Sequence, residues 1–135
     1  MPLFLLDTNF CIHFIRGRAW ARSALEKVKL SDVSISAITV GELCEGAHRS
    51  DHPIKEMAKA EAFLNPFEII SFGRDEAIEW GLIEARLRKE GNPIEAEDSM
   101  IAAIAHKHGR TLVTGNIKHF ARVKLTFRTS AGQFA

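Results

Sequence analysis

Short apolar segments alternate along this chain with segments whose apolar residues recur at helical spacing, and this alternation constrains the fold most strongly. Five segments have the composition of short strands: residues 3–6, 33–36, 67–72, 111–114 and 124–127. Six segments have helical patterns: residues 8–15, 18–29, 38 onward, 54–64, 74–90 and 96–108. Because strands that alternate with helices form parallel sheets with helices on both faces, the pattern predicts an α/β fold with a central, mainly parallel sheet.

Two local expectations concern the second half of the chain. The longest helical segment, residues 74–90, carries an apolar stripe of the kind by which an amphipathic helix faces a protein core. The stripe consists of Ala77, Ile78, Leu82, Ile83 and Leu87. Residues from 129 onward show no helical or strand pattern, so we expect a loose tail there.

Composition limits the class of protein. The chain has 135 residues, which is the size of one domain, so residues 1–135 are expected to form a single unit with its own core. No apolar run is long enough to cross a membrane, and the N-terminus lacks the pattern of a secretory signal, so we expect a cytoplasmic protein. Cys11 and Cys44 have no metal-motif spacing and are expected to be thiols in the core.

Charge is distributed unevenly although the formal net charge is only +1. Residues 106–135 contain six lysines and arginines and no acidic residue, whereas residues 26–105 contain sixteen of the seventeen acids. A basic region of this kind can contact a phosphate backbone, although an ordinary solvated surface would have the same composition.

Polar side chains follow the predicted strands where those strands end. Asp7 comes directly after the first strand, Glu42 lies shortly after the second, and Asn116 follows the strand at residues 111–114. Asp98 lies in the first turn of the helix after Asn92-Pro93. Because ligands bind beyond the carboxyl ends of parallel strands, these side chains are expected to share one edge of the sheet.

Each acidic residue also has a purely structural interpretation. Asp7 can cap the helix that follows it. Glu42 can form a capping box with Thr39, and Asp98 can stabilise the positive end of a helix dipole. Taken together, however, three carboxylates at one edge repel one another and favour a bound cation. Oxygen ligands suit Mg²⁺ and Mn²⁺, and a cation held by carboxylates can activate water to cleave a phosphodiester.

Four segments of the chain resemble a known family, the PIN domain, and within it the VapC-type toxin ribonucleases of toxin–antitoxin pairs. The segments are LLDTNFCI (residues 5–12), ISAITVGELCEGA (35–47), GNPIEAEDSMIAAIA (91–105) and LVTGNIKHF (112–120). Their order and separation are more specific than any single acid. The resemblance implies a three-layer α/β/α sandwich and a Mg²⁺- or Mn²⁺-dependent endoribonuclease that cleaves RNA, including transfer RNA in several VapC-type toxins.

The resemblance also assigns roles to individual side chains. Asp7, Glu42 and Asp98 match the acidic positions that hold the metal and position the attacking water. Thr8 lies in the same first motif, and Asn9 is expected to orient Asp7 by a hydrogen bond. Thr114 and Asn116 match a polar segment that lines the pocket. These side chains form the expected catalytic site.

One departure from the family concerns the segment after the last of these strands. Many PIN domains supply a fourth acid there, at the positions that Asn116 and His119 occupy in this chain. Asn116 still offers an oxygen ligand, and His119 is a weaker substitute that can instead meet a phosphate. The missing carboxylate favours one tightly held metal over a two-metal mechanism.

The resemblance further implies macromolecular partners. A VapB-type antitoxin is expected to mask the active site, and a homodimer is expected to form through apolar surface from the early helices. RNA is the implied substrate. Candidate phosphate contacts are Arg86, Arg88, Lys118 and Arg122, for which a role as ordinary surface charge is the competing interpretation.

Two other functions fit part of the pattern. An aspartate after the first strand also serves as a phosphorylated nucleophile in some phosphatases, but those need a second aspartate where this chain has Asn9. Receiver domains need an acidic pair near the start of the chain, and none precedes Asp7. A PIN-like module that binds RNA or an antitoxin with weak or no nuclease activity is the second alternative, and the missing fourth acid is the feature that favours it.

Overall fold

The computed structural model describes residues 3–115 and 129–130. Their strands form one sheet in the order β3-β2-β1-β4-β5, and every neighbouring pair is parallel. The strands are β1 (Phe4–Leu6), β2 (Val33–Ser36), β3 (Glu68–Ile70), β4 (Thr111–Val113) and β5 (Thr129–Ser130). The parallel sheet predicted from the alternation is confirmed, and β1 lies at its centre.

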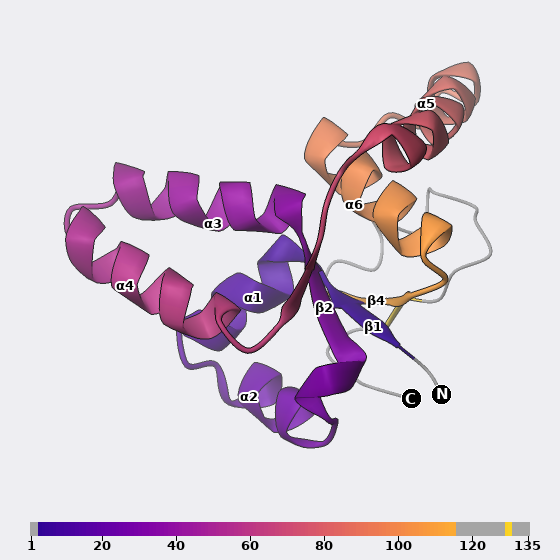
Figure 1. The fold of residues 1–135 in the computed structure, drawn as a ribbon. Helices are drawn as coiled ribbons and strands as arrows, with labels where there is room; N and C mark the ends of the chain where they lie inside the picture. Colours follow the sequence, from indigo (N-terminus) through magenta and orange to yellow (C-terminus); the bar gives the residue numbers. More distant parts are fainter. Residues whose placement is uncertain (1–2, 116–128, 131–135) are drawn as a thin grey trace.

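Helices cover both faces of this sheet (Figure 1). The helices are α1 (Thr8–Ile15), α2 (Ala19–Glu26), α3 (Ala37–Arg49), α4 (Pro53–Leu64), α5 (Arg74–Lys89) and α6 (Ala96–Lys107), with a 3₁₀ turn, η1, at Leu30–Asp32. Figure 1 shows α3 and α4 as one antiparallel pair on one side of the strands, with α5 and α6 as a second pair on the other. The described residues therefore form the three-layer α/β/α sandwich that the resemblance implies.

Side-chain alternation along β1 explains why this strand is apolar throughout. Phe4 and Leu6 point into a core that they share with α1, α2, α3 and α4. Leu5 points to the opposite face, into a second core with α5 and α6. A strand that is buried on both faces needs apolar residues at every position, so its sequence shows no polar alternation.

The carboxyl ends of the three central strands lie in register. Leu6 is paired with Ile35 of β2 and with Val113 of β4. The next residue on each strand is polar and buried: Asp7, Ser36 and Thr114. The register therefore brings these three polar groups to one edge of the sheet.

Ser36 begins α3 and thereby positions the acidic face of that helix. Its hydroxyl oxygen accepts a hydrogen bond from the Thr39 backbone N–H at 3.1 Å, and its O–H lies 3.3 Å from the Thr39 hydroxyl. The capping box proposed between Thr39 and Glu42 is therefore wrong, because the cap lies three residues earlier. The Glu42 side chain is left available for another partner.

We expect Ser36→Ala to lower the free energy of unfolding by about 1–2 kcal/mol, because it removes the cap of a helix that is packed on the sheet. Urea unfolding followed by circular dichroism measures this change. Ser23→Ala, at an exposed position of α2, is the matched control and should change stability by less than about 0.5 kcal/mol. Equal unfolding midpoints for the two variants would contradict this role for Ser36.

Several expectations about individual segments need correction. Ile78 and Leu82 are 62% and 67% exposed, because the face of α5 that meets α6 is narrow and includes Ile83 and Leu87 instead. Residues 129–130 form β5 rather than part of a loose tail, because they pair with β4. The strand expected at residues 124–127 lies outside the described residues. Cys11 is buried, Cys44 is only half-buried, and both are free thiols.

Within the described residues, none of the helices combines the length and the apolar character that crossing a membrane would require.

Candidate active site

Asp7 is the most constrained polar residue at the sheet edge. It is the N-cap of α1, and its side chain accepts a hydrogen bond from the Phe10 backbone N–H at 2.7 Å. Its other carboxylate oxygen accepts a hydrogen bond from the Thr114 hydroxyl. Asp7 is only 2% exposed. The capping interpretation is therefore correct, but a cap needs neither this burial nor the second bond from β4.

The environment of Asp7 makes its negative charge unfavourable. Burial raises the pKa of this carboxyl from 3.8 to about 6, and the negative charges of Asp98 and Glu42 add to the rise. The hydrogen bonds from Thr114 and Phe10 act in the opposite direction and limit it. A carboxylate that is held rigidly and that forms no ion pair with a basic side chain of the described residues is suited to a cation.

Glu42 approaches the same edge from α3. Its carboxylate accepts a hydrogen bond from the Thr8 hydroxyl at 2.6 Å, and the Thr8 hydroxyl lies 2.9 Å from that of Thr39. Partial burial raises the pKa of Glu42, and the charges of Asp98, Glu97 and Glu45 raise it further. A chain of hydroxyls therefore connects the cap of α3 with the acid at its second turn.

Asp98 lies half-buried in the first turn of α6, as the sequence predicts. Its charge acts on both Asp7 and Glu42, so the three carboxylates belong to one electrostatic group. Within the described part of the chain, however, no three acidic, histidine or cysteine side chains are arranged as a closed set of metal ligands. The donor chemistry fits a hard divalent cation, and water would fill the remaining coordination positions.

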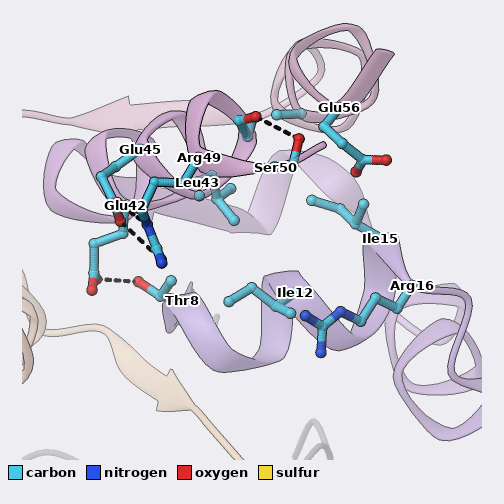
Figure 2. A pocket seen from close by; sticks show the side chains of 13 residues that line it. Thr8, Ile12, Ile15, Arg16, Glu42, Leu43, Glu45, Arg49, Ser50 and Glu56 are labelled. Atoms are coloured by element: carbon cyan, nitrogen blue, oxygen red, sulfur yellow. Dashed lines mark hydrogen bonds and ion pairs between the residues drawn. The ribbon is translucent and has the colours of Figure 1, made fainter. Parts of the chain in front are cut away.

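A pocket of about 410 Å³ opens beside Glu42 and Thr8. Figure 2 shows that it extends from these two residues between α1 and α3 toward Glu56 of α4. Ile12 and Ile15 form its apolar wall, and Arg16 points into it from the end of α1. The acidic edge is therefore continuous with a pocket large enough for part of a polymer chain.

Other expected site residues have different outcomes. Asn9 is exposed, and among the described hydrogen bonds those that orient Asp7 come from Phe10 and Thr114 rather than from Asn9. The orienting role expected of Asn9 therefore stays a prediction. Four further expected residues lie outside the described part of the chain: Asn116, Lys118, His119 and Arg122.

The two candidate RNA contacts on α5 both pair with acids on their own helix. Arg88 Nε lies 3.3 Å from a Glu84 carboxylate oxygen, and Arg86 Nε lies 3.9 Å from Glu90. Arg88 is exposed, and an ion pair of an exposed arginine is weak, so Arg88 remains available to a phosphate. Arg86 is half-buried, with its Nε and Nη2 atoms inside the protein, and is less accessible.

Sequence reasoning missed Ser36 and the Phe10 backbone N–H, and it paired Thr39 with Glu42 instead of with Ser36. Ser36 and Thr39 position α3, and the Phe10 backbone N–H fixes the Asp7 carboxylate. A serine directly before a helical segment is a known capping signal and could have identified Ser36. The Phe10 N–H has no sequence signature, because any residue at that position supplies the same donor.

Comparison with known proteins identifies the family to which this chain belongs. The model of the PIN domain matches residues 4–125, which include Asp7, Glu42 and Asp98. The chain belongs to the PIN-domain family.

Within that family, the chain belongs with the VapC proteins. It is 35% identical to the tRNA(fMet)-specific endonuclease VapC of Salmonella typhimurium, over 91% of this chain and 93% of that protein. It is also 35% identical to ribonuclease VapC2 of Haemophilus influenzae, with the same coverage. The crystal structure of DNA-bound VapBC from Salmonella typhimurium matches with a TM-score of 0.89 and 34% identity, over 96% of this chain and 98% of that one.

Proposed function

We propose that this chain is a divalent-metal-dependent endoribonuclease and the toxin of a VapBC-type toxin–antitoxin pair. The observation that carries the proposal is the Asp7 carboxylate, which is buried at the carboxyl end of β1 and feels the charges of Glu42 and Asp98. No helix cap needs three acids in one electrostatic group. The 35% identity to VapC ribonucleases supports the same assignment.

Each side chain has a proposed task in this reaction. A divalent cation at the site supplies Lewis-acid chemistry, which lowers the pKa of water and offsets charge on the phosphate. Asp7 and Asp98 are its proposed ligands, and Glu42 is a ligand directly or through water. Thr114 and the Phe10 N–H hold the Asp7 carboxylate still, while each carboxylate oxygen keeps a further lone pair for the cation.

Mg²⁺ and Mn²⁺ are the proposed cofactors, because the candidate ligands are all oxygen atoms. We propose one tightly held cation, with Asn116 as an additional oxygen donor. His119 is proposed to meet a phosphate, and the proposed backbone contacts are Arg86, Arg88, Lys118 and Arg122.

The proposed substrate is RNA, and transfer RNA is the first candidate because the Salmonella relative is named for one. The proposed protein partner is a VapB-type antitoxin, since solved VapBC structures from Salmonella typhimurium and Rickettsia felis match this fold. A homodimer and a cytoplasmic location, where both RNA and antitoxin are available, complete the proposal.

Cleavage of total RNA tests the proposed function. Purified protein that has been freed of antitoxin is incubated with total RNA in Mn²⁺, in Mg²⁺ or in EDTA, and fragment ends are mapped by sequencing. We expect discrete cuts with metal and none with EDTA. If folded, metal-loaded protein binds RNA but cuts none of it, the chain is the binding module rather than a nuclease.

A further inference from the structure

Trp20, in the first turn of α2, is 42% exposed although it is the largest side chain type. An exposed indole can bind a flat partner by stacking, because Trp combines a large apolar face with few rotatable bonds. The position of this ring relative to the acidic edge decides what that partner is.

The ring lies next to the segment that holds Asp7. Its Cη2 atom is 3.6 Å from the position that a Cβ on Gly115 would occupy, so the indole contacts the chain at Gly115. Gly115 directly follows Thr114, whose hydroxyl donates to Asp7. The indole also meets the Phe10 ring edge to face, with centroids 5.7 Å apart, and the Phe10 N–H donates to Asp7. Trp20 therefore contacts Phe10, whose N–H donates to Asp7, and Gly115, which follows the second donor, Thr114.

The indole is also held in a fixed orientation. Phe10 is fully buried and meets it at 77°, and the His13 ring lies 5.2 Å away on α1. An exposed aromatic ring that is already ordered loses little conformational entropy when a base stacks on it.

The charge around Trp20 suits a polyanion. Residues 8–25 contain no acidic residue and three arginines: Arg16, Arg18 and Arg22. All three are exposed, and no ion pair to any of them occurs within the described ranges 3–115 and 129–130. The Arg22 guanidinium lies over the Phe14 ring, and Arg16 lines the pocket beside Glu42. Arg18 is therefore the arginine whose side-chain position is not set by another contact among the described residues. Basic side chains interleaved with an aromatic ring are the combination that binds single-stranded nucleic acid.

Sheet order places Trp20 and the pocket on different sides of Asp7. The chain after β2 supplies Glu42, which lines the pocket in Figure 2 together with residues of α1, whereas the chain after β4 supplies Gly115, which contacts Trp20. Because β1 lies between β2 and β4, a strand of RNA that crosses Asp7 can reach both.

We propose that Trp20 is a stacking platform for an unpaired RNA base next to the cleaved phosphodiester, that Arg18 contacts the backbone beside it, and that Arg16 contacts the backbone from the pocket on the other side of Asp7. This inference rests on the proposed ribonuclease function and adds a substrate subsite to it. It makes Trp20 a specificity-determining residue that favours single-stranded over duplex RNA, because only an unpaired base offers a free face.

Tryptophan fluorescence tests the platform without relying on cleavage. Asp7→Asn protein is titrated with a mixed-sequence single-stranded RNA about 12 nucleotides long, and separately with the same RNA as a duplex. We expect the single strand to quench fluorescence, and the duplex to quench it much less. The double variant Asp7→Asn/Trp20→Phe shows which tryptophan is quenched. It keeps an aromatic ring at position 20 and keeps Trp80, so it should lose most of the quenching if Trp20 is the quenched residue.

Affinity provides the second readout. Trp20→Ala should weaken binding of the single strand by about tenfold or more, whereas Trp20→Phe should retain most of it. Leu30→Ala is the matched control, because Leu30 is also 42% exposed but is not placed at the acidic edge, and its affinity should not change. Unquenched fluorescence at saturating RNA, or quenching only when an antitoxin protein is added, would overturn the proposal.

The two proposals can fail separately. Quenching by single-stranded RNA from a protein that cuts no RNA would keep the platform and refute the nuclease. Metal-dependent cleavage without quenching would keep the nuclease and refute the platform. If Trp20→Ala does not fold, comparing the fluorescence quenching of Asp7→Asn with that of Asp7→Asn/Trp20→Phe still tests whether RNA stacks on Trp20.

Discussion

Asp7→Asn is expected to abolish RNA cleavage while the fold is preserved. The asparagine can still accept the Phe10 N–H bond and cap α1, so the helix should begin where it does now. It cannot supply the negative charge that a cation needs. Because metal-assisted charge stabilisation contributes several kcal/mol to catalysis, we expect cleavage to fall on the order of a thousandfold or more. Cleavage rates in Mn²⁺ measure the loss of activity, and circular dichroism of the variant checks that the fold is preserved.

Asp75→Asn is the matched control for this loss. Asp75 also lies in the first turn of a helix, α5, but it is exposed and is not among the charges that act on Asp7. The control protein should cleave at the wild-type rate. Glu42→Gln and Asp98→Asn should also reduce cleavage. Each should reduce it by less than Asp7→Asn, because Asp7 is the most buried of the three carboxylates and should contribute most to metal affinity. Wild-type cleavage by the Asp7→Asn protein would contradict the proposed site.

The stability of the metal-free protein should depend on the ionisation of Asp7. The pKa of this group is 3.8 when unfolded and about 6 when folded, chiefly because of burial. Between these values the native state holds a proton that the unfolded state has lost, so this group lowers stability as pH rises. The effect is fully developed above pH 6 and amounts to at most about 3 kcal/mol.

Comparison with Asp7→Asn isolates this contribution from the other titrating groups. In EDTA, the variant should be about as stable as wild type near pH 4 and more stable by up to about 3 kcal/mol near pH 7.5. Urea unfolding at several pH values provides the difference. A difference between the two proteins that does not change with pH would show that Asp7 ionises normally in the folded state.

The sheet and its helices were predictable because their signals are local. Residues 33–36 and 8–15 have the strand and helix patterns that the structure confirms. Ile78 and Leu82 show where this reasoning fails. Both fit an apolar stripe by spacing, but the orientation of α5 on α6 decides which stripe is buried, and that orientation depends on contacts far apart in sequence.

The candidate site divides in the same way. Asp7, Glu42 and Asp98 could be found because acids after strands and at helix starts are visible in sequence. The partners of Asp7 could not, because the bond from Thr114 spans 107 residues and depends on the register of β1 with β4. The link from Thr8 to Glu42 likewise depends on how α1 and α3 pack.

Binding of Mn²⁺ measured by isothermal titration calorimetry tests the central claim most directly, that Asp7, Glu42 and Asp98 together hold a divalent cation. The account predicts saturable binding of one ion to the wild-type and Asp75→Asn proteins, and a loss of affinity of about tenfold or more in both Asp7→Asn and Asp98→Asn. Equal binding by all four folded proteins, or no binding at millimolar Mn²⁺, would contradict it.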